Sequence, residues 1–196
     1  MEQLFSDPKR PLLDQAVAKD LAPLPIDAVA DHIENRFMAS KRDPGTALAP
    51  LLEFTRGHPM RSMMLAHFLW ARCPEGGSAD EEIWLKAQEA ALRQASPTMR
   101  AIWKALPVNE RRASLALANL GSPYVGDNAA AVGLNPNSVG TALEGLRDRA
   151  DVIETGGALR LTDPLFELWL QRRGVLPADL GNETDEASTG TKIGDP

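Results

Sequence analysis

The first half of the chain repeats apolar residues at the spacing of amphipathic helices. In the first such stretch the apolar positions are four residues apart: Val29, Ile33 and Phe37. Stretches of the same kind follow at 48–55, 59–73 and 80–94. Apolar residues three and four positions apart lie on one face of a helix, so each stretch predicts a helix that packs against the others. Because proline suits the first turn of a helix, Ser96-Pro97 predicts a separate short helix that ends near Leu106.

A different pattern begins after Leu106-Pro107. Helical stretches lead to a tight turn, Gly133-Leu134-Asn135-Pro136, and a further helix is predicted from about Asn137 to Arg149. Two short runs then flank a Gly-Gly pair and predict two strands joined by a glycine turn: 152–155 and 158–161. This order of elements within 107–173 is that of a winged helix-turn-helix.

The two ends of the chain show no such period. Residues 1–24 contain several prolines and predict an irregular lead-in, whereas residues 174–196 are polar and predict a disordered tail. The expected fold is therefore mainly α. A helical bundle at 25–105 is followed by a winged helix-turn-helix at 107–173 with a small two-stranded wing.

The composition limits the partners and the cellular compartment that the protein is expected to have. With 43% hydrophobic and 24% charged residues and a formal net charge of −6, the chain lacks the positive charge of a protein that coats nucleic acid. It has no run of about 18 apolar residues, so no membrane partner is expected. The single cysteine excludes an intrachain disulfide and favours the reducing cytoplasm. The histidines and Cys73 lack zinc-site spacing, so no metal site is expected.

The predicted winged helix offers a candidate nucleic-acid surface. The start of its third helix has side chains that hydrogen-bond to bases or phosphates, and the end of that helix and the wing carry arginines: Asn135, Asn137, Ser138, Thr141, Arg147, Arg149 and Arg160. Against this, acidic residues outnumber arginines by one within 107–173, whereas phosphate neutralisation supplies much of the affinity for DNA. DNA binding and protein contacts both stay open for this module.

The most distinctive segment is the loop Gly57-His58-Pro59, which leads into a predicted helix with Arg61 in its first turn. Free N–H groups and the dipole at a helix N-terminus favour an anion, and an arginine there adds a bidentate grip on phosphate oxygens. The alternative is an ordinary helix start with Arg61 facing solvent.

The string Thr55-Arg56-Gly57-His58-Pro59-Met60-Arg61 resembles the lid of AAA+ and STAND-type ATPases, in which a Gly-x-Pro turn approaches the nucleotide and a following arginine is the second sensor. Three further segments are similar to bacterial and archaeal ATPases of this group: 4–12, 137–146 and 161–170. The resemblance covers about residues 1–173 in a consistent order. It implies that 25–105 is a helical lid domain, that Gly57, His58 and Pro59 border the nucleotide, and that Arg61 reaches the phosphates.

The departure from that family is large. The chain contains no G-x-x-x-x-G-K-[ST] sequence, so the loop that cradles phosphates is missing. No catalytic residues are therefore assigned, and the chain by itself is not expected to be an enzyme. It is expected to meet ATP or ADP only together with a P-loop core, encoded upstream or carried by a separate chain, which would be its main partner.

The sequence leaves three hypotheses. The leading one is a non-catalytic C-terminal segment of an AAA+ or STAND-like ATP-binding protein, in which the lid senses nucleotide and the winged helix binds DNA or protein. The alternative is a free-standing winged-helix transcription regulator that dimerises through its helical region. The third is a protein-interaction module. A lid without its core is expected to expose apolar surface along the helices at 27–37 and 59–73.

Overall fold

The computed structural model describes residues 22–174. The predicted lead-in before residue 22 and the predicted tail after residue 174 lie outside this range. The helices are α2 (Ile26–Ala39), α3 (Leu48–Thr55), α4 (Pro59–Trp70), α5 (Glu81–Ala105), α6 (Val108–Asn119), α7 (Asn128–Ala131), α8 (Val139–Asp148) and α9 (Pro164–Arg173). Single 3-10 turns lie at Gly45–Ala47 and Pro136–Ser138, and the strands are β1 (Val152–Thr155) and β2 (Ala158–Leu161). The expected mainly helical fold with a small two-stranded wing is confirmed.

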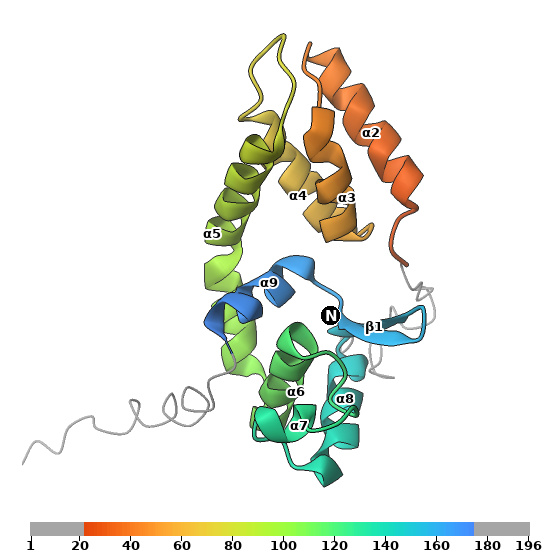
Figure 1. The fold of residues 1–196 in the computed structure, drawn as a ribbon, viewed down its shortest axis with the longest axis vertical. Helices are drawn as coiled ribbons and strands as arrows, with labels where there is room; N and C mark the ends of the chain where they lie inside the picture. Colours follow the sequence, from red (N-terminus) through yellow and green to blue (C-terminus); the bar gives the residue numbers. More distant parts are fainter. Residues whose placement is uncertain (1–21, 175–196) are drawn as a thin grey trace, which may run out of the picture.

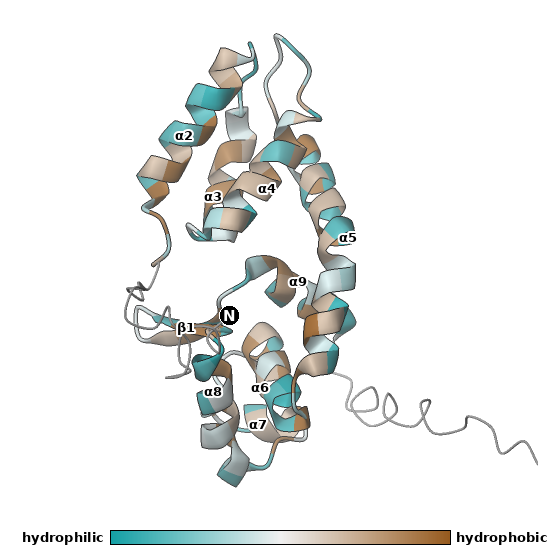
Figure 2. Ribbon diagram, turned by 180° about the vertical axis from the view of Figure 1, so that it is seen from behind, coloured by the Kyte–Doolittle hydropathy of each residue, from teal (hydrophilic) through white to brown (hydrophobic). Residues whose placement is uncertain are grey.

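Helices α2, α3 and α4 and the first part of α5 form a helical bundle at one end of the molecule (Figure 1). The face of α2 predicted to be apolar is buried in this bundle, together with fully buried leucines of α3 and α4: Val29, Ile33, Phe37, Leu51, Leu65 and Leu69. Each such side chain contributes about 2 kcal/mol by leaving water. Figure 2 shows hydrophilic and hydrophobic residues interspersed along α2 and α5, as amphipathic helices require.

The hairpin of the second unit matches its prediction residue for residue. The two strands pair antiparallel, with Val152 opposite Leu161 and Thr155 opposite Ala158. Gly156 and Gly157 have φ of 60° and 75°, the pair of positive angles that a type I′ hairpin turn needs. The wing packs beside α6, α8 and α9, which supply the core of this unit.

The predicted break at Ser96-Pro97 is wrong. Helix α5 runs without interruption through this point, and Figure 1 shows it passing from the helical bundle to the second unit. Pro97 is exposed, so its ring meets solvent, and its missing N–H removes one backbone hydrogen bond. Buried side chains before and after it, Trp84 and Trp103 among them, hold both parts of α5 in place. Tertiary packing therefore overrides the local preference of proline.

The end of α5 and helix α9 share an aromatic contact. The rings of Trp103 and Trp169 meet edge to face with centroids 6.2 Å apart, and Phe166 stacks on Trp169 at 5.9 Å. The guanidinium of Arg173 covers Trp169 at 4.7 Å from the ring centroid. Since α5 also packs along α4, this contact ties the second unit to the helical bundle.

Candidate functional site

The loop between α3 and α4 has a backbone that its sequence dictates. Arg56 ends α3 in the left-handed conformation, and Gly57 follows with φ of 76°. A Cβ on Gly57 would lie 2.2 Å from the carbonyl oxygen of Leu24, so only glycine fits. Pro59 occupies the first turn of α4, and the Nδ1 atom of His58 caps the helix by accepting from the Arg61 N–H at 3.4 Å.

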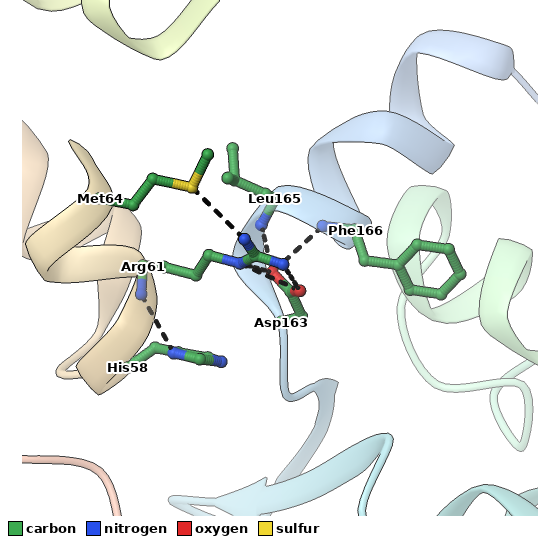
Figure 3. A network of polar contacts seen from close by, with 6 residues as sticks. All are labelled: His58, Arg61, Met64, Asp163, Leu165 and Phe166. Carbon is green, nitrogen blue, oxygen red and sulfur yellow. Dashed lines mark hydrogen bonds and ion pairs between the residues drawn. The ribbon is translucent and has the colours of Figure 1, made fainter. Parts of the chain in front are cut away.

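Arg61 points from α4 towards α9 and is 6% exposed. Its Nε and Nη2 atoms donate to the two carboxylate oxygens of Asp163 at 2.9 Å and 2.5 Å, as Figure 3 shows. This is the bidentate geometry in which an arginine holds a carboxylate or a phosphate. A third nitrogen, Nη1, lies 3.4 Å from the sulfur of Met64.

Asp163 also begins α9. Its Oδ1 atom accepts from the Leu165 N–H at 2.9 Å and from the Phe166 N–H at 3.4 Å, which caps the helix (Figure 3). One carboxylate therefore satisfies both the buried guanidinium and the free N–H groups of a helix N-terminus. A ligand that replaced Asp163 as the partner of Arg61 would therefore change the contacts of the residue that caps α9.

A second ion pair lies one helical turn further along α9. Arg56 donates from Nη2 to the carboxylate of Glu167 at 2.6 Å, with side chains 31% and 21% exposed. The two pairs hold the end of α3 and the start of α4 against one face of α9. Breaking the Arg61 pair should cost more than breaking the Arg56 pair, because the guanidinium of Arg61 is buried and that of Arg56 is 31% exposed.

The surroundings of His58 shift the pKa of its imidazole. Burial lowers the pKa of its imidazole, an effect that the carboxylate of Asp163 partly offsets and the guanidinium of Arg61 reinforces. The imidazole is therefore neutral at pH 7. Because Nδ1 accepts a hydrogen bond in the cap of α4, the single proton of the neutral ring lies on Nε2.

The structure brings the predicted nucleotide residues Gly57, His58, Pro59 and Arg61 together at one loop–helix junction, and their contact with a nucleotide stays a prediction. The alternative of a solvent-facing Arg61 is wrong, because this side chain is buried. Sequence reasoning missed its partner, Asp163. No local signal in the sequence links two positions that are 102 residues apart.

The predicted DNA-contacting residues at the start of α8 face solvent. The side chain of Asn135 accepts from the Asn137 N–H at 2.9 Å and so shapes the turn before the helix. Asn137 and Thr141 are exposed, and Ser138 is half-buried. This surface is accessible to a base edge or to a protein partner alike.

The predicted arginines of this unit have different surroundings. Arg149 is held by Glu110 and by Asp151, with 3.0 Å between Nε and the Asp151 carboxylate. Arg147 and Arg160 are exposed and line a cleft of about 630 Å³ beside the wing, together with Glu154 and other residues. The arginines thus do not form a continuous basic face.

Two classes of site find no support between residues 22 and 174. No helix in this range is both long and apolar enough to cross a membrane. The same range holds no cluster of three or more His, Cys, Asp or Glu residues that would hold a metal ion. Cys73 is buried among carbonyl oxygens.

No family model, curated protein or solved structure matches this chain. The resemblance to AAA+ and STAND-type ATPases therefore rests on the sequence motifs described above.

Proposed function

We propose that the chain is the lid and winged-helix part of an AAA+ or STAND-like ATP-binding protein, and that it passes the nucleotide state of a P-loop core to the winged helix. The observation that carries the proposal is the bidentate pair between the buried Arg61 and Asp163. It connects the residue implied as the phosphate sensor directly to the first turn of the last helix.

The proposed mechanism is an exchange of partners at Arg61. A guanidinium binds phosphate oxygens in the same two-pronged geometry as a carboxylate, so nucleotide phosphates in a docked core would compete with Asp163. Release of Asp163 would leave α9 held by the Arg56–Glu167 and Arg172–Glu89 pairs and by its apolar contacts. The winged helix would then be free to shift relative to the lid, which converts phosphate binding into movement of a binding surface.

The test is titration calorimetry with ATP and ADP on the wild-type chain, Asp163→Asn and Asp163→Asn/Arg61→Ala. Wild type should show no binding below about 1 mM, because it lacks a P-loop and Arg61 is occupied. Asp163→Asn keeps a capping side chain but removes the competing charge, so weak ATP binding should appear and should vanish in the double variant. Circular dichroism confirms that each variant is folded.

Two results contradict the proposal. Micromolar ATP binding by wild type that Arg61→Ala abolishes would mean a self-sufficient nucleotide site in this chain. ATP binding to Asp163→Asn that is absent, or unchanged by the loss of Arg61, would mean that this arginine is not a phosphate ligand.

A free-standing DNA-binding regulator is the second candidate, favoured by the exposure of Asn137, Thr141, Arg147 and Arg160. Glu144 and Asp148, also exposed on α8, weigh against it because they repel phosphates. Fluorescence anisotropy with a duplex DNA of mixed sequence separates the two. Binding that weakens with salt and with Arg147→Ala/Arg160→Ala supports the regulator, and no binding at low salt excludes it.

A further inference from the structure

Helices α2 and α4 leave an apolar groove between them, and Arg61 is not among the residues that line it. It has a volume of about 400 Å³, and its lining includes Phe37 of α2 and Met63 and Trp70 of α4. Trp70 is fixed in place, because its Nε1–H donates to the hydroxyl of Ser40 at 2.8 Å. The groove is thus formed before any partner arrives, which lowers the entropic cost of binding.

The α4 wall of the groove continues as an exposed apolar stripe. Met60, Met63 and Trp70 lie along one side of the helix, at intervals of three and seven residues, and are 60%, 37% and 36% exposed. Large apolar side chains that are aligned on one face and left in water mark an interaction surface. The sequence had led us to expect exposed apolar surface on this helix.

The charged side chain in the lining of the groove is that of Arg36. The lining contains no carboxylate. The acids of α2, namely Asp27, Asp31 and Glu34, lie at least about 140° round the helix from Arg36, at 100° per residue. Helix α4 contains no acidic residue, and the guanidinium of Arg42 covers the Trp70 ring at 4.7 Å.

We infer that this groove binds an amphipathic helix with acidic flanks, supplied by a partner protein. A trough between two helices accepts apolar anchors spaced three or four residues apart on a third helix. Acidic residues beside those anchors would complement Arg36 and its neighbours. A second copy of this chain fits less well, because a dimer formed through this groove would bring the Arg36 side chains of the two copies close together. The inference is independent of the proposed function, since it involves neither nucleotide nor Arg61.

Trp70 supplies a direct readout. The other tryptophans, Trp84, Trp103 and Trp169, are at most 9% exposed, so acrylamide quenching of the wild-type protein reports mainly on Trp70. The probe is a synthetic peptide of about 18 residues without tryptophan, with Leu and Phe at helical spacing and Glu elsewhere. Its twin carries Lys in place of Glu.

The acidic peptide should bind with a Kd of about 10 μM and reduce quenching of Trp70 about twofold, whereas the basic twin should bind at least about tenfold more weakly. Arg36→Glu should weaken the acidic peptide about fivefold and improve the basic twin. Met63→Glu should abolish binding. Met38→Glu is the matched control: Met38 is 61% exposed on α2 but does not line the groove, so binding should be unchanged.

Each alternative outcome overturns the inference. Failure of the acidic peptide to bind, or equal affinity for the two peptides, removes the acidic helix as the occupant. A monomer–dimer equilibrium that Met63→Glu abolishes assigns the groove to a second copy. Shielding of Trp70 by phosphatidylserine vesicles, with none by the peptide, assigns it to a lipid surface.

Discussion

At the scale of single residues, the α3–α4 loop depends on side chains that have little freedom to change. The Cα of Gly57 lies so close to the carbonyl oxygen of Leu24 that a side chain at this position would collide with it. The carbonyl oxygen of Gly57 in turn accepts a hydrogen bond from the Leu24 N–H at 2.9 Å. His58 caps α4 with a ring nitrogen, an uncommon choice where Ser, Thr, Asp or Asn usually serve. An imidazole makes this cap sensitive to protonation.

The histidine cap predicts a pH dependence of stability. Because burial lowers the pKa of His58, the folded protein binds fewer protons there than the unfolded chain as the pH falls below about 7. The free energy of unfolding should therefore decrease as the pH falls through the unfolded value of about 6.5, and the loss should be present in full below the lowered pKa of the folded state. Urea unfolding at a series of pH values measures this.

His58→Asn is the control for this effect. Asparagine caps a helix well and does not titrate in this range, so the variant should show a shallower decrease in stability over the same pH interval. Equal slopes in wild type and variant would show that other groups cause the dependence.

At the scale of secondary-structure elements, α5 is the element that least follows its local sequence. Pro97 lies in its interior, where proline costs up to about 3 kcal/mol. The hydroxyl of Ser96 donates to the Leu92 carbonyl oxygen at 2.7 Å, a local bond that often accompanies a bend.

We expect Pro97→Ala to raise the free energy of unfolding by about 2 kcal/mol. The exposed ring makes no core contact to lose, and alanine restores the N–H donor to the helix. Pro97→Gly restores the same donor with a poorer helix former, so its gain should be smaller by about 1 kcal/mol. A loss of stability in the alanine variant would mean that the packing of the two units requires the proline. Urea unfolding compares the three proteins.

The elements also show what the sequence could predict. The hairpin at 152–161 was predicted in full, since Gly156-Gly157 sets the turn and the turn sets the register. The apolar face of α2 was predicted for the same reason, because its spacing is local. The continuity of α5 was missed, because it depends on Trp84 and Trp103 packing against other helices. The partner of Arg61 was missed because only the folded chain brings α4 and α9 together.

At the scale of the whole molecule, three features link the helical bundle to the winged helix. Helix α5 is continuous between them, Trp103 of α5 packs against Trp169 of α9, and ion pairs hold α9 to the other helices. These ion pairs are Arg56–Glu167, Arg61–Asp163 and Arg172–Glu89. Removal of one partner from a buried pair leaves an uncompensated charge, whereas exposed pairs contribute little.

A double-mutant cycle should separate these contributions. Asp163→Asn should lower the free energy of unfolding by about 3 kcal/mol, because it leaves the buried guanidinium of Arg61 without its counter-charge. Arg61→Ala should cost less, because the Asp163 side chain is 23% exposed, and the double variant should lose less than the sum of the two. Arg56→Ala, at the more exposed pair, should cost less than about 1 kcal/mol. Urea denaturation provides all the values. Additive losses for Arg61 and Asp163 would contradict a direct coupling of the two units through this pair.

The position of Pro97 along α5 has a mechanical consequence. At about 1.5 Å per residue, the arm of the helix from Pro97 back to Glu81 is about 24 Å long. A bend of about 10° at Pro97 would therefore move the far end of this arm, and the helices packed on it, by about 4 Å. Flexing at this proline would turn a small rearrangement around Trp103 and α9 into a larger displacement at the opposite end of the molecule.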